Sequence, residues 1–159
     1  MEQLLHLLRS NARLSDSELA VMLGKSEQEV ERDIRQLEER GIIKGYSAIV
    51  DEQASDPNSV TALIELKVTP QSQSGYDEIA RTISSYEQVE SVRLMSGAYD
   101  ILVSVTGSNI RDVSRFVAQN LAAIDAVQST ATHFLLRSYK VNGITVCEEE
   151  SDERGLVSP

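Results

Sequence analysis

The sequence has very little of several residue types that mark particular classes of protein. Its 159 residues include one cysteine, two histidines and no tryptophan. The single Cys147 excludes an internal disulfide, and so few histidines and cysteines exclude a zinc cage built from those side chains. No apolar run approaches the roughly 20 residues that span a membrane, and residues 1–6 lack the basic start of a secretory signal. We therefore expect a cytoplasmic protein that holds no metal and enters no membrane.

Common enzyme signatures are absent as well. The chain contains no GxSxG, P-loop, HExxH or GxGxxG pattern. These patterns mark nucleophile elbows, phosphate loops, zinc peptidases and dinucleotide sites. We expect a protein that is not an enzyme and that needs no cofactor.

The chain is acidic, but its charge is unevenly distributed. It has 15 basic and 25 acidic residues, a net charge of -10; residues 1–50 hold seven and nine of these, and residues 51–159 hold eight and sixteen. Five acidic residues fall in the run from Glu148 to Glu153, so we expect residues 147–159 to form a disordered, solvated tail. Because the first fifty residues are nearly neutral, the overall acidity does not exclude nucleic-acid binding there.

Two helix-start signals stand close together in those fifty residues. Ser15 and Glu18 form a capping box, in which each side chain satisfies a backbone N–H of the first helical turn. Ser26 and Glu29 form a second. Between them, Gly24 is suited to the left-handed conformation that ends a helix. Two short helices joined by a tight turn are typical of the helix-turn-helix, whose second helix enters the DNA major groove.

The outward face of the second predicted helix carries side chains that can read bases. Val30, Ile34 and Leu37 recur at helical spacing and define its buried face. At about 100° per residue, Gln28 and Arg32 lie on the opposite side. Glutamine can pair with adenine and arginine with guanine. The predicted DNA contacts are Lys25, Ser26, Gln28, Arg32, Arg35 and Lys44.

An alternative for this segment is a pair of capped helices that pack together without contacting DNA. It stays open because acidic side chains at 27, 29, 31 and 33 flank the outward stripe and repel phosphate. After the helices, residues 42–50 have the composition of a strand or hairpin, which we interpret as a wing or a linker strand. Residues 51–59 are polar and turn-forming, and are predicted to be the linker between two domains.

From residue 60 onward the periodicity predicts strand, helix, strand, strand, helix, strand. The segments are 60–69, 76–83, 89–94, 100–105, 113–121 and 127–139. This is the ferredoxin-like βαββαβ order, which places both helices on one face of a four-stranded antiparallel sheet. The predicted fold class is α+β, with a winged helix-turn-helix domain over 1–50 and a ferredoxin-like effector-binding and oligomerisation domain over 60–146.

The second face of such a sheet needs a cover. The third strand carries apolar residues that we assign to both faces, Ile101 and Val103 to one and Leu102 and Val105 to the other. We therefore expect two chains to pack sheet against sheet in a homodimer. The dipeptide at 142 and 143, Asn-Gly, predicts a final hairpin.

Three motifs extend the interpretation to the whole chain. Residues 11–20 contain "NARLS" followed by "ELA", residues 37–46 read "LEERGIIKGY", and residues 96–102 read "SGAYDIL", with Val127 and the "TAT" of 130–132 after them. Together they resemble the Lrp/AsnC family of bacterial and archaeal transcription regulators, also called feast/famine regulatory proteins. The resemblance reaches to about residue 141. One departure is Asp33, at a position where the family usually has arginine.

The resemblance implies a C-terminal domain that dimerises, assembles into larger oligomers, often octamers, and binds small molecules near residues 97–100. These molecules are usually amino acids. Backbone N–H groups around Gly97 and Ala98 can bind an α-carboxylate, and Asp100 can bind an α-ammonium. The predicted effector site comprises Gly97, Ala98, Tyr99, Asp100, Thr130 and Thr132. A simple tight turn at 97–99 is the alternative.

The predicted function is therefore sequence-specific regulation of transcription in response to a small-molecule effector, with double-stranded DNA and further copies of the chain as partners. Some proteins that resemble this family act as sirohaem decarboxylases, which gives an enzymatic alternative. The chain offers only His6 and His133 as imidazole groups for such chemistry. A third hypothesis is an effector-binding scaffold that does not bind DNA.

Overall fold

The computed structural model describes residues 1–69 and 75–146. The predicted tail at 147–159 lies outside the described residues. The chain divides into two compact units, one made of Met1–Val50 with the segment that begins at Tyr139, and the other of Asp51–Ser138. Each unit has a hydrophobic core of its own.

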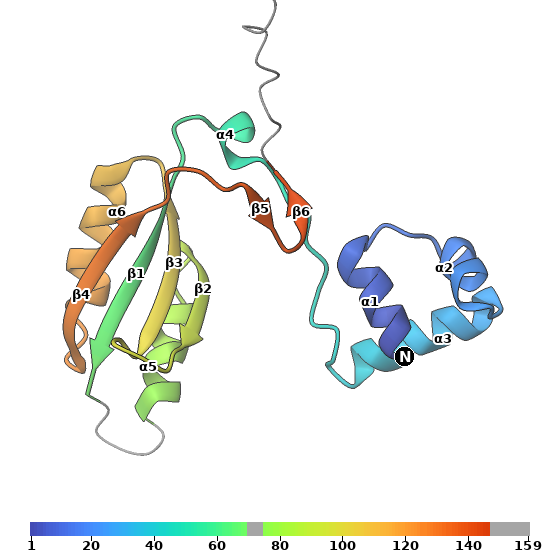
Figure 1. Cartoon of the computed structure of the whole chain (residues 1–159). Coiled ribbons are helices and arrows are strands. Elements are labelled where there is room, and N and C mark those ends of the chain that lie inside the picture. Colours follow the sequence, from blue (N-terminus) through green and yellow to red (C-terminus); the bar gives the residue numbers. More distant parts are fainter. Residues whose placement is uncertain (70–74, 147–159) are drawn as a thin grey trace, which may run out of the picture. The chain divides into compact units, whose positions relative to one another are not determined.

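Three helices form the N-terminal unit: α1 (Glu2–Ser10), α2 (Asp16–Leu23) and α3 (Glu27–Glu39) (Figure 1). Both predicted capping boxes are confirmed, at Ser15 before α2 and at Ser26 before α3. Gly24 ends α2 in the left-handed conformation, with φ of 64°. The local signals in the sequence thus fix where α2 and α3 begin and how the turn between them closes.

The core of this unit is small and aliphatic. One side of each helix contributes to it, because the apolar residues recur at helical spacing. Ile34 and Leu14 are among the half-buried residues around it. The fully buried members are Leu4, Leu19, Ala20, Val30 and Leu37.

The expected strand or wing over 42–50 is not present. These residues form no strand, because an extended segment becomes a strand only when a neighbouring strand satisfies its backbone groups. The predicted linker at 51–59 is also more ordered than expected, since it contains a short helix, α4 (Glu52–Ser55).

The second unit contains the predicted four-stranded antiparallel sheet. Its strands are β1 (Val60–Val68), β2 (Val89–Leu94), β3 (Ile101–Gly107) and β4 (Val127–Phe134), and their spatial order is β2-β3-β1-β4. Helix α5 (Gly75–Ser84) joins β1 to β2, and α6 (Ile110–Phe116) continues into a π-helical turn (Val117–Leu121) before β4. The ferredoxin-like order is confirmed (Figure 1).

Both helices pack on one face of the sheet. Ile64 of β1 pairs with Val103 of β3, and both are fully buried with Ile83 of α5 and Leu121 of the π-helical turn. Val105 lies on this same face, since it pairs with the buried Ala62. Our assignment of Val105 to the opposite face was therefore wrong, because residues two apart in a strand share a face.

Two further predictions concern the last described part of the chain, one wrong in extent and one confirmed. Strand β4 ends at Phe134, so the long strand expected to reach Tyr139 is shorter. The predicted hairpin at Asn142 and Gly143 is confirmed: it joins β5 (Lys140–Val141) to β6 (Ile144–Thr145), and both turn residues have positive φ. Positive φ at both central residues is the geometry that favours Asn-Gly in two-residue hairpins.

Candidate DNA-binding and effector sites

The turn between α2 and α3 is fixed by backbone and side-chain hydrogen bonds. The N–H of Lys25 donates to the carbonyl of Ala20 at 3.0 Å, which closes the end of α2. The N–H of Glu29 donates to the Ser26 hydroxyl at 3.3 Å, and the N–H of Ser26 donates to the Glu29 carboxylate at 2.9 Å. The start of α3 is thereby held in one position relative to α2.

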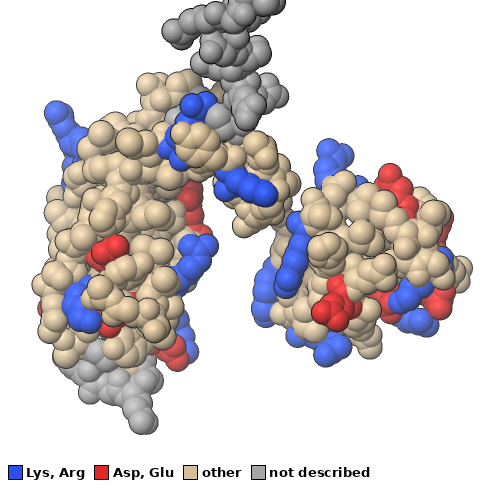
Figure 2. All heavy atoms as spheres, in the orientation of Figure 1, with Lys and Arg blue, Asp and Glu red and all other residues tan. Residues whose placement is uncertain are grey.

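Helix α3 presents the predicted stripe to solvent. Val30 and Leu37 are buried on one side, and Gln28, Arg32 and Arg35 are exposed. Basic and acidic side chains are interspersed over the surface of this unit (Figure 2). This face has the side chains predicted to contact bases, with carboxylates beside them, so the ion pairs within the protein determine which of its cations are unpaired.

Two of the predicted cationic contacts are engaged in ion pairs. Arg35 lies 2.6 Å from Glu31 one turn earlier, and Lys25 lies 2.5 Å from Asp33. Arg32 has no ion pair with another described residue. The hydrogen bond from Lys25 is the largest of the influences that lower the pKa of Asp33, against an opposing effect of burial. Among the three cations, Arg32 is therefore the one that needs no partner exchange to meet a phosphate or a base.

The capping glutamates are also perturbed. The backbone N–H of Ser26, followed by its hydroxyl, lowers the pKa of Glu29. Ser15 lowers the pKa of Glu18 in the same way. Both glutamates stay charged near the positive ends of α2 and α3, where a negative charge stabilises a helix.

Lys44 lies apart from the other predicted contacts. Its ammonium is 2.7 Å from the point that a Cβ on Gly41 would occupy, which places it just after the C-terminal end of α3. Lys25 and Ser26 lie just before the N-terminal end of α3. A helix of 13 residues is about 20 Å long. The structure therefore places Lys25, Ser26, Gln28 and Arg32 before or within the first half of α3, Arg35 in its second half, and Lys44 beyond its C-terminal end.

The predicted effector turn joins β2 to β3 at the end of the sheet where β1 finishes. Gly97 and Ala98 are exposed. Asp100 accepts hydrogen bonds from the N–H of Val68 at 2.9 Å and from the Lys67 ammonium at 3.3 Å. These bonds, the backbone one first, lower the pKa of Asp100. Its carboxylate thus already helps to join β3 to the end of β1.

The two predicted threonines lie on the edge strand β4. Thr130 pairs with Leu66 and Thr132 with Ile64, and both threonines are half-buried. The backbone N–H of Asp100 donates to the carbonyl of the same Leu66 at 2.9 Å. Thr130 and Asp100 are therefore both neighbours of Leu66 in β1. Thr132 is two residues further along β4.

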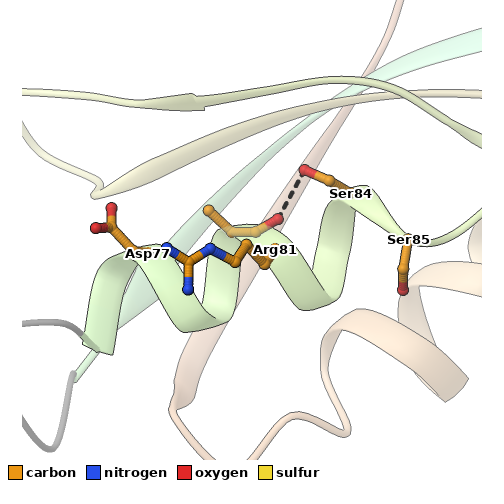
Figure 3. A pocket seen from close by; sticks show the side chains of 5 residues that line it. Asp77, Arg81, Ser84 and Ser85 are labelled. Atoms are coloured by element: carbon orange, nitrogen blue, oxygen red, sulfur yellow. Dashed lines mark hydrogen bonds between the residues drawn. The ribbon is translucent and has the colours of Figure 1, made fainter.

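A separate hollow lies along α5, and none of the predicted site residues lines it. It has a volume of about 480 Å³, and Figure 3 shows Asp77, Arg81, Ser84 and Ser85 around it. The Ser84 hydroxyl donates to the Ala80 carbonyl at 2.7 Å, and the Ser85 hydroxyl donates to the Thr82 carbonyl at 2.7 Å. Both serines are thus used within the helix.

Two other features are absent from residues 1–69 and 75–146, the part of the chain that the structure describes. In these ranges no group of three or more His, Cys, Asp or Glu side chains is arranged to hold a metal ion. Within the same ranges, no helix has the combination of length and apolar character that crossing a membrane requires.

The sequence did not indicate the partners that several site residues have. Lys67 contacts Asp100, which is 33 residues away in the chain. Tyr46 contacts Glu38, which is 8 residues away. The pairing of Lys25 with Asp33 was equally unexpected, although both residues stood out on their own. Spacing along α3 signals contacts only between residues three or four apart, so none of these pairs could be found from periodicity.

Comparison with known proteins identifies both units. The sequence model of the Lrp/AsnC ligand binding domain matches residues 61–144, and that of the AsnC-type helix-turn-helix domain matches residues 2–38. The chain belongs to the Lrp/AsnC family. It is an Lrp/AsnC-type DNA-binding transcription regulator, and not an enzyme, so the sirohaem decarboxylase alternative is not retained.

Individual members of the Lrp/AsnC family show how far the likeness extends. An uncharacterized HTH-type transcriptional regulator of Bacillus subtilis, YugG, is 41% identical over 158 residues, covering 99% of this chain and 95% of that protein. The crystal structure of PH0061 has a TM-score of 0.76 at 27% identity, covering 88% of this chain and 93% of that one. The regulator NMB0573 of Neisseria meningitidis, solved with L-Met, has a TM-score of 0.70 at 24% identity, covering 87% and 88%.

Proposed function

We propose that this regulator reads DNA through the outward face of α3 and that a small-molecule effector, an amino acid bound near the turn after β2, adjusts its affinity for DNA. The observation that carries the proposal is the exposed stripe of Gln28, Arg32 and Arg35 on a helix whose start is fixed by a capping box. These side chains offer the paired hydrogen bonds that distinguish adenine and guanine in the major groove.

The effector part of the proposal draws support from the turn at 97–100. The exposed backbone at Gly97 and Ala98 can donate N–H groups to an α-carboxylate. Asp100 retains its charge beside Lys67, and each carboxylate oxygen has more than one acceptor site, so an α-ammonium can join its present partners. The complex of a family member with L-Met supports an amino acid as the ligand class.

We also propose that the regulator works as a homo-oligomer in the cytoplasm, where bacterial and archaeal DNA is found. Dimers that assemble further, up to an octamer, present several copies of α3 to one DNA molecule. Because each α3 carries carboxylates beside its cations, joint binding by several helices compensates for the weak attraction of each one. Analytical ultracentrifugation with and without an amino acid tests this part of the proposal.

The DNA part is tested by fluorescence anisotropy with DNA from the protein's own promoter. Arg32→Ala and Arg35→Ala should weaken binding, and Arg81→Ala on α5 is the matched control, because it removes an exposed arginine from the other unit. If the wild-type protein shows no salt-sensitive DNA binding in any oligomeric state, the proposal fails. Sequencing of DNA crosslinked to the protein in cells then distinguishes two alternatives. A scaffold that does not bind DNA enriches no sequence, whereas a regulator whose operators lie away from its own promoter enriches those operators.

The effector part is tested by calorimetric titration with a panel of amino acids that includes L-methionine. Thr130→Val, which removes only the hydroxyl, should weaken the binding of any amino acid that the wild type binds. Thr82→Val is the control: it makes the same change on α5, where the Thr82 hydroxyl donates to the Glu78 carbonyl at 3.0 Å and has no part in the proposed site. Equal affinity in wild type and Thr130→Val removes the threonine from the site.

A further inference from the structure

We propose that Lys25 is a positioning residue that sets α3 through Asp33, and that Arg32 is the cation that meets DNA at this end of the helix. The proposal rests on the DNA-reading role proposed for α3. It departs from the sequence-based expectation, in which Lys25 was itself a DNA contact. The deciding observation is the ion pair of 2.5 Å between the Lys25 ammonium and the Asp33 carboxylate.

Lys25 contacts two helices of the helix-turn-helix from the turn between them. Its backbone N–H donates to the carbonyl of Ala20 in α2. Its side chain spans eight residues to reach Asp33, in the second turn of α3. Lys25 thus connects the end of α2, the turn and the body of α3, while the capping box at Ser26 fixes only the first turn of α3.

The direction of the contact turns the ammonium away from the reading stripe. At about 100° per residue, Asp33 lies about 60° from the buried Val30 and about 100° from Arg32 around the helix. Its side chain is only 15% exposed. Lys25 therefore reaches toward the half-buried flank of α3, where its ammonium is paired with a carboxylate of the same chain.

The other ion pair on α3 has the opposite character. The Arg35 and Glu31 side chains are 64% and 57% exposed, against 35% and 15% for Lys25 and Asp33. An exposed pair at one-turn spacing is weak and exchanges readily with water or phosphate. If Lys25 moved to a phosphate, it would leave a half-buried carboxylate without its partner, which costs more than separating an exposed pair. Arg35 can therefore turn to DNA, whereas Lys25 stays with Asp33.

The salt dependence of DNA binding separates the two roles. Each phosphate contact adds about 0.9 to the steepness of the plot of log affinity against log salt concentration. In the full-length protein, Arg32→Met should weaken binding to promoter DNA, because it removes a side chain that reads a base. Lys25→Met should also weaken binding, but without the decrease in slope of about 0.9 for each engaged α3 that the loss of a phosphate contact brings, because the helix is displaced and no phosphate contact is lost.

A charge reversal supplies the decisive control. Lys25→Asp alone should weaken binding strongly, and the double variant Lys25→Asp with Asp33→Lys should recover most of the lost affinity by restoring the pair in reverse. A phosphate contact by Lys25 predicts the opposite, since an aspartate at 25 repels DNA whatever stands at 33. Urea unfolding of each variant shows that the helix-turn-helix is folded.

Three outcomes overturn the proposal. A decrease in slope of about 0.9 for each engaged α3 in Lys25→Met makes Lys25 a phosphate contact. Failure of the reversed pair to recover affinity, with the double variant folded, removes the positioning role. Absence of DNA binding by the wild-type protein overturns the proposed function itself. This outcome is distinguished from the first two outcomes because it is measured on the wild type alone.

Discussion

The hydroxyl of Tyr46 donates a hydrogen bond of 2.9 Å to the Glu38 carboxylate near the C-terminal end of α3. Tyr46 belongs to the extended segment that leaves the helix-turn-helix and leads into the next unit. Partial burial, and then the hydrogen bond to Glu38, raise the pKa of Tyr46, so the phenol is protonated and can donate at neutral pH. The bond fixes the first part of the connecting chain to the proposed reading helix.

We expect this bond to carry part of the coupling between effector and DNA. Tyr46→Phe should leave the DNA affinity of the effector-free protein nearly unchanged and reduce the change in affinity that the effector causes, whose usual size is about 1 to 3 kcal/mol. Anisotropy titrations with and without effector measure this difference. Glu38→Gln is the control, because its amide oxygen still accepts the bond and should keep the coupling. Full coupling in Tyr46→Phe would show that the bond has no part in it.

The capping box of α3 should contribute measurably to stability. Ser26→Ala removes the side-chain acceptor for the N–H of Glu29, and loss of such a cap lowers the free energy of unfolding by about 1 kcal/mol. Urea unfolding followed by circular dichroism measures the loss. Ser47→Ala, in the extended segment after α3, removes a hydroxyl with no capping role and should change stability much less. Equal effects of the two substitutions contradict a capping role.

The Lys25–Asp33 pair should make stability depend on pH in the acidic range. Because the folded-state pKa of Asp33 lies below its ordinary value of 3.8, the pair stabilises the protein fully above that value. The stabilisation declines as pH falls through the unfolded-state pKa and is lost below the folded-state pKa. The difference in unfolding free energy between wild type and Asp33→Asn should therefore shrink between about pH 7 and about pH 3. A difference that is constant over this range contradicts the pairing.

Asp100 should be more important for the sheet than Lys67. Strand β1 changes register against β4 between Lys67 and Val68, and the N–H of Val68 turns to the Asp100 carboxylate instead. Asp100→Ala leaves this part-buried donor without its partner, which should lower the thermal unfolding temperature. Lys67→Met removes only an exposed ammonium and should cost much less. Thermal unfolding of the two variants ranks them, and equal losses would mean that the ion pair is the main contribution.

Much of the fold was determined by short-range patterns in the sequence. The capping boxes at Ser15 and Ser26 and the Asn142–Gly143 turn were predicted correctly because each depends on atoms within a few residues. The strands around Ile64 and Val103 followed from apolar alternation. The expected strand at 42–50 failed because its composition suits a strand but no described neighbour pairs with it.

The outward stripe on α3 was equally predictable, since a helix of known start presents its side chains at a fixed angular spacing. Only the tertiary structure decided which polar and charged side chains have partners on other elements. It placed Lys25 against Asp33, Tyr46 against Glu38, and Asp100 against Val68. Such contacts depend on how separate elements pack, and local sequence does not encode the distance between two side chains on different elements. The sequence thus determined the family, the main helices and the outward face of α3. The packing of the chain determined which charged and polar side chains have partners on other elements.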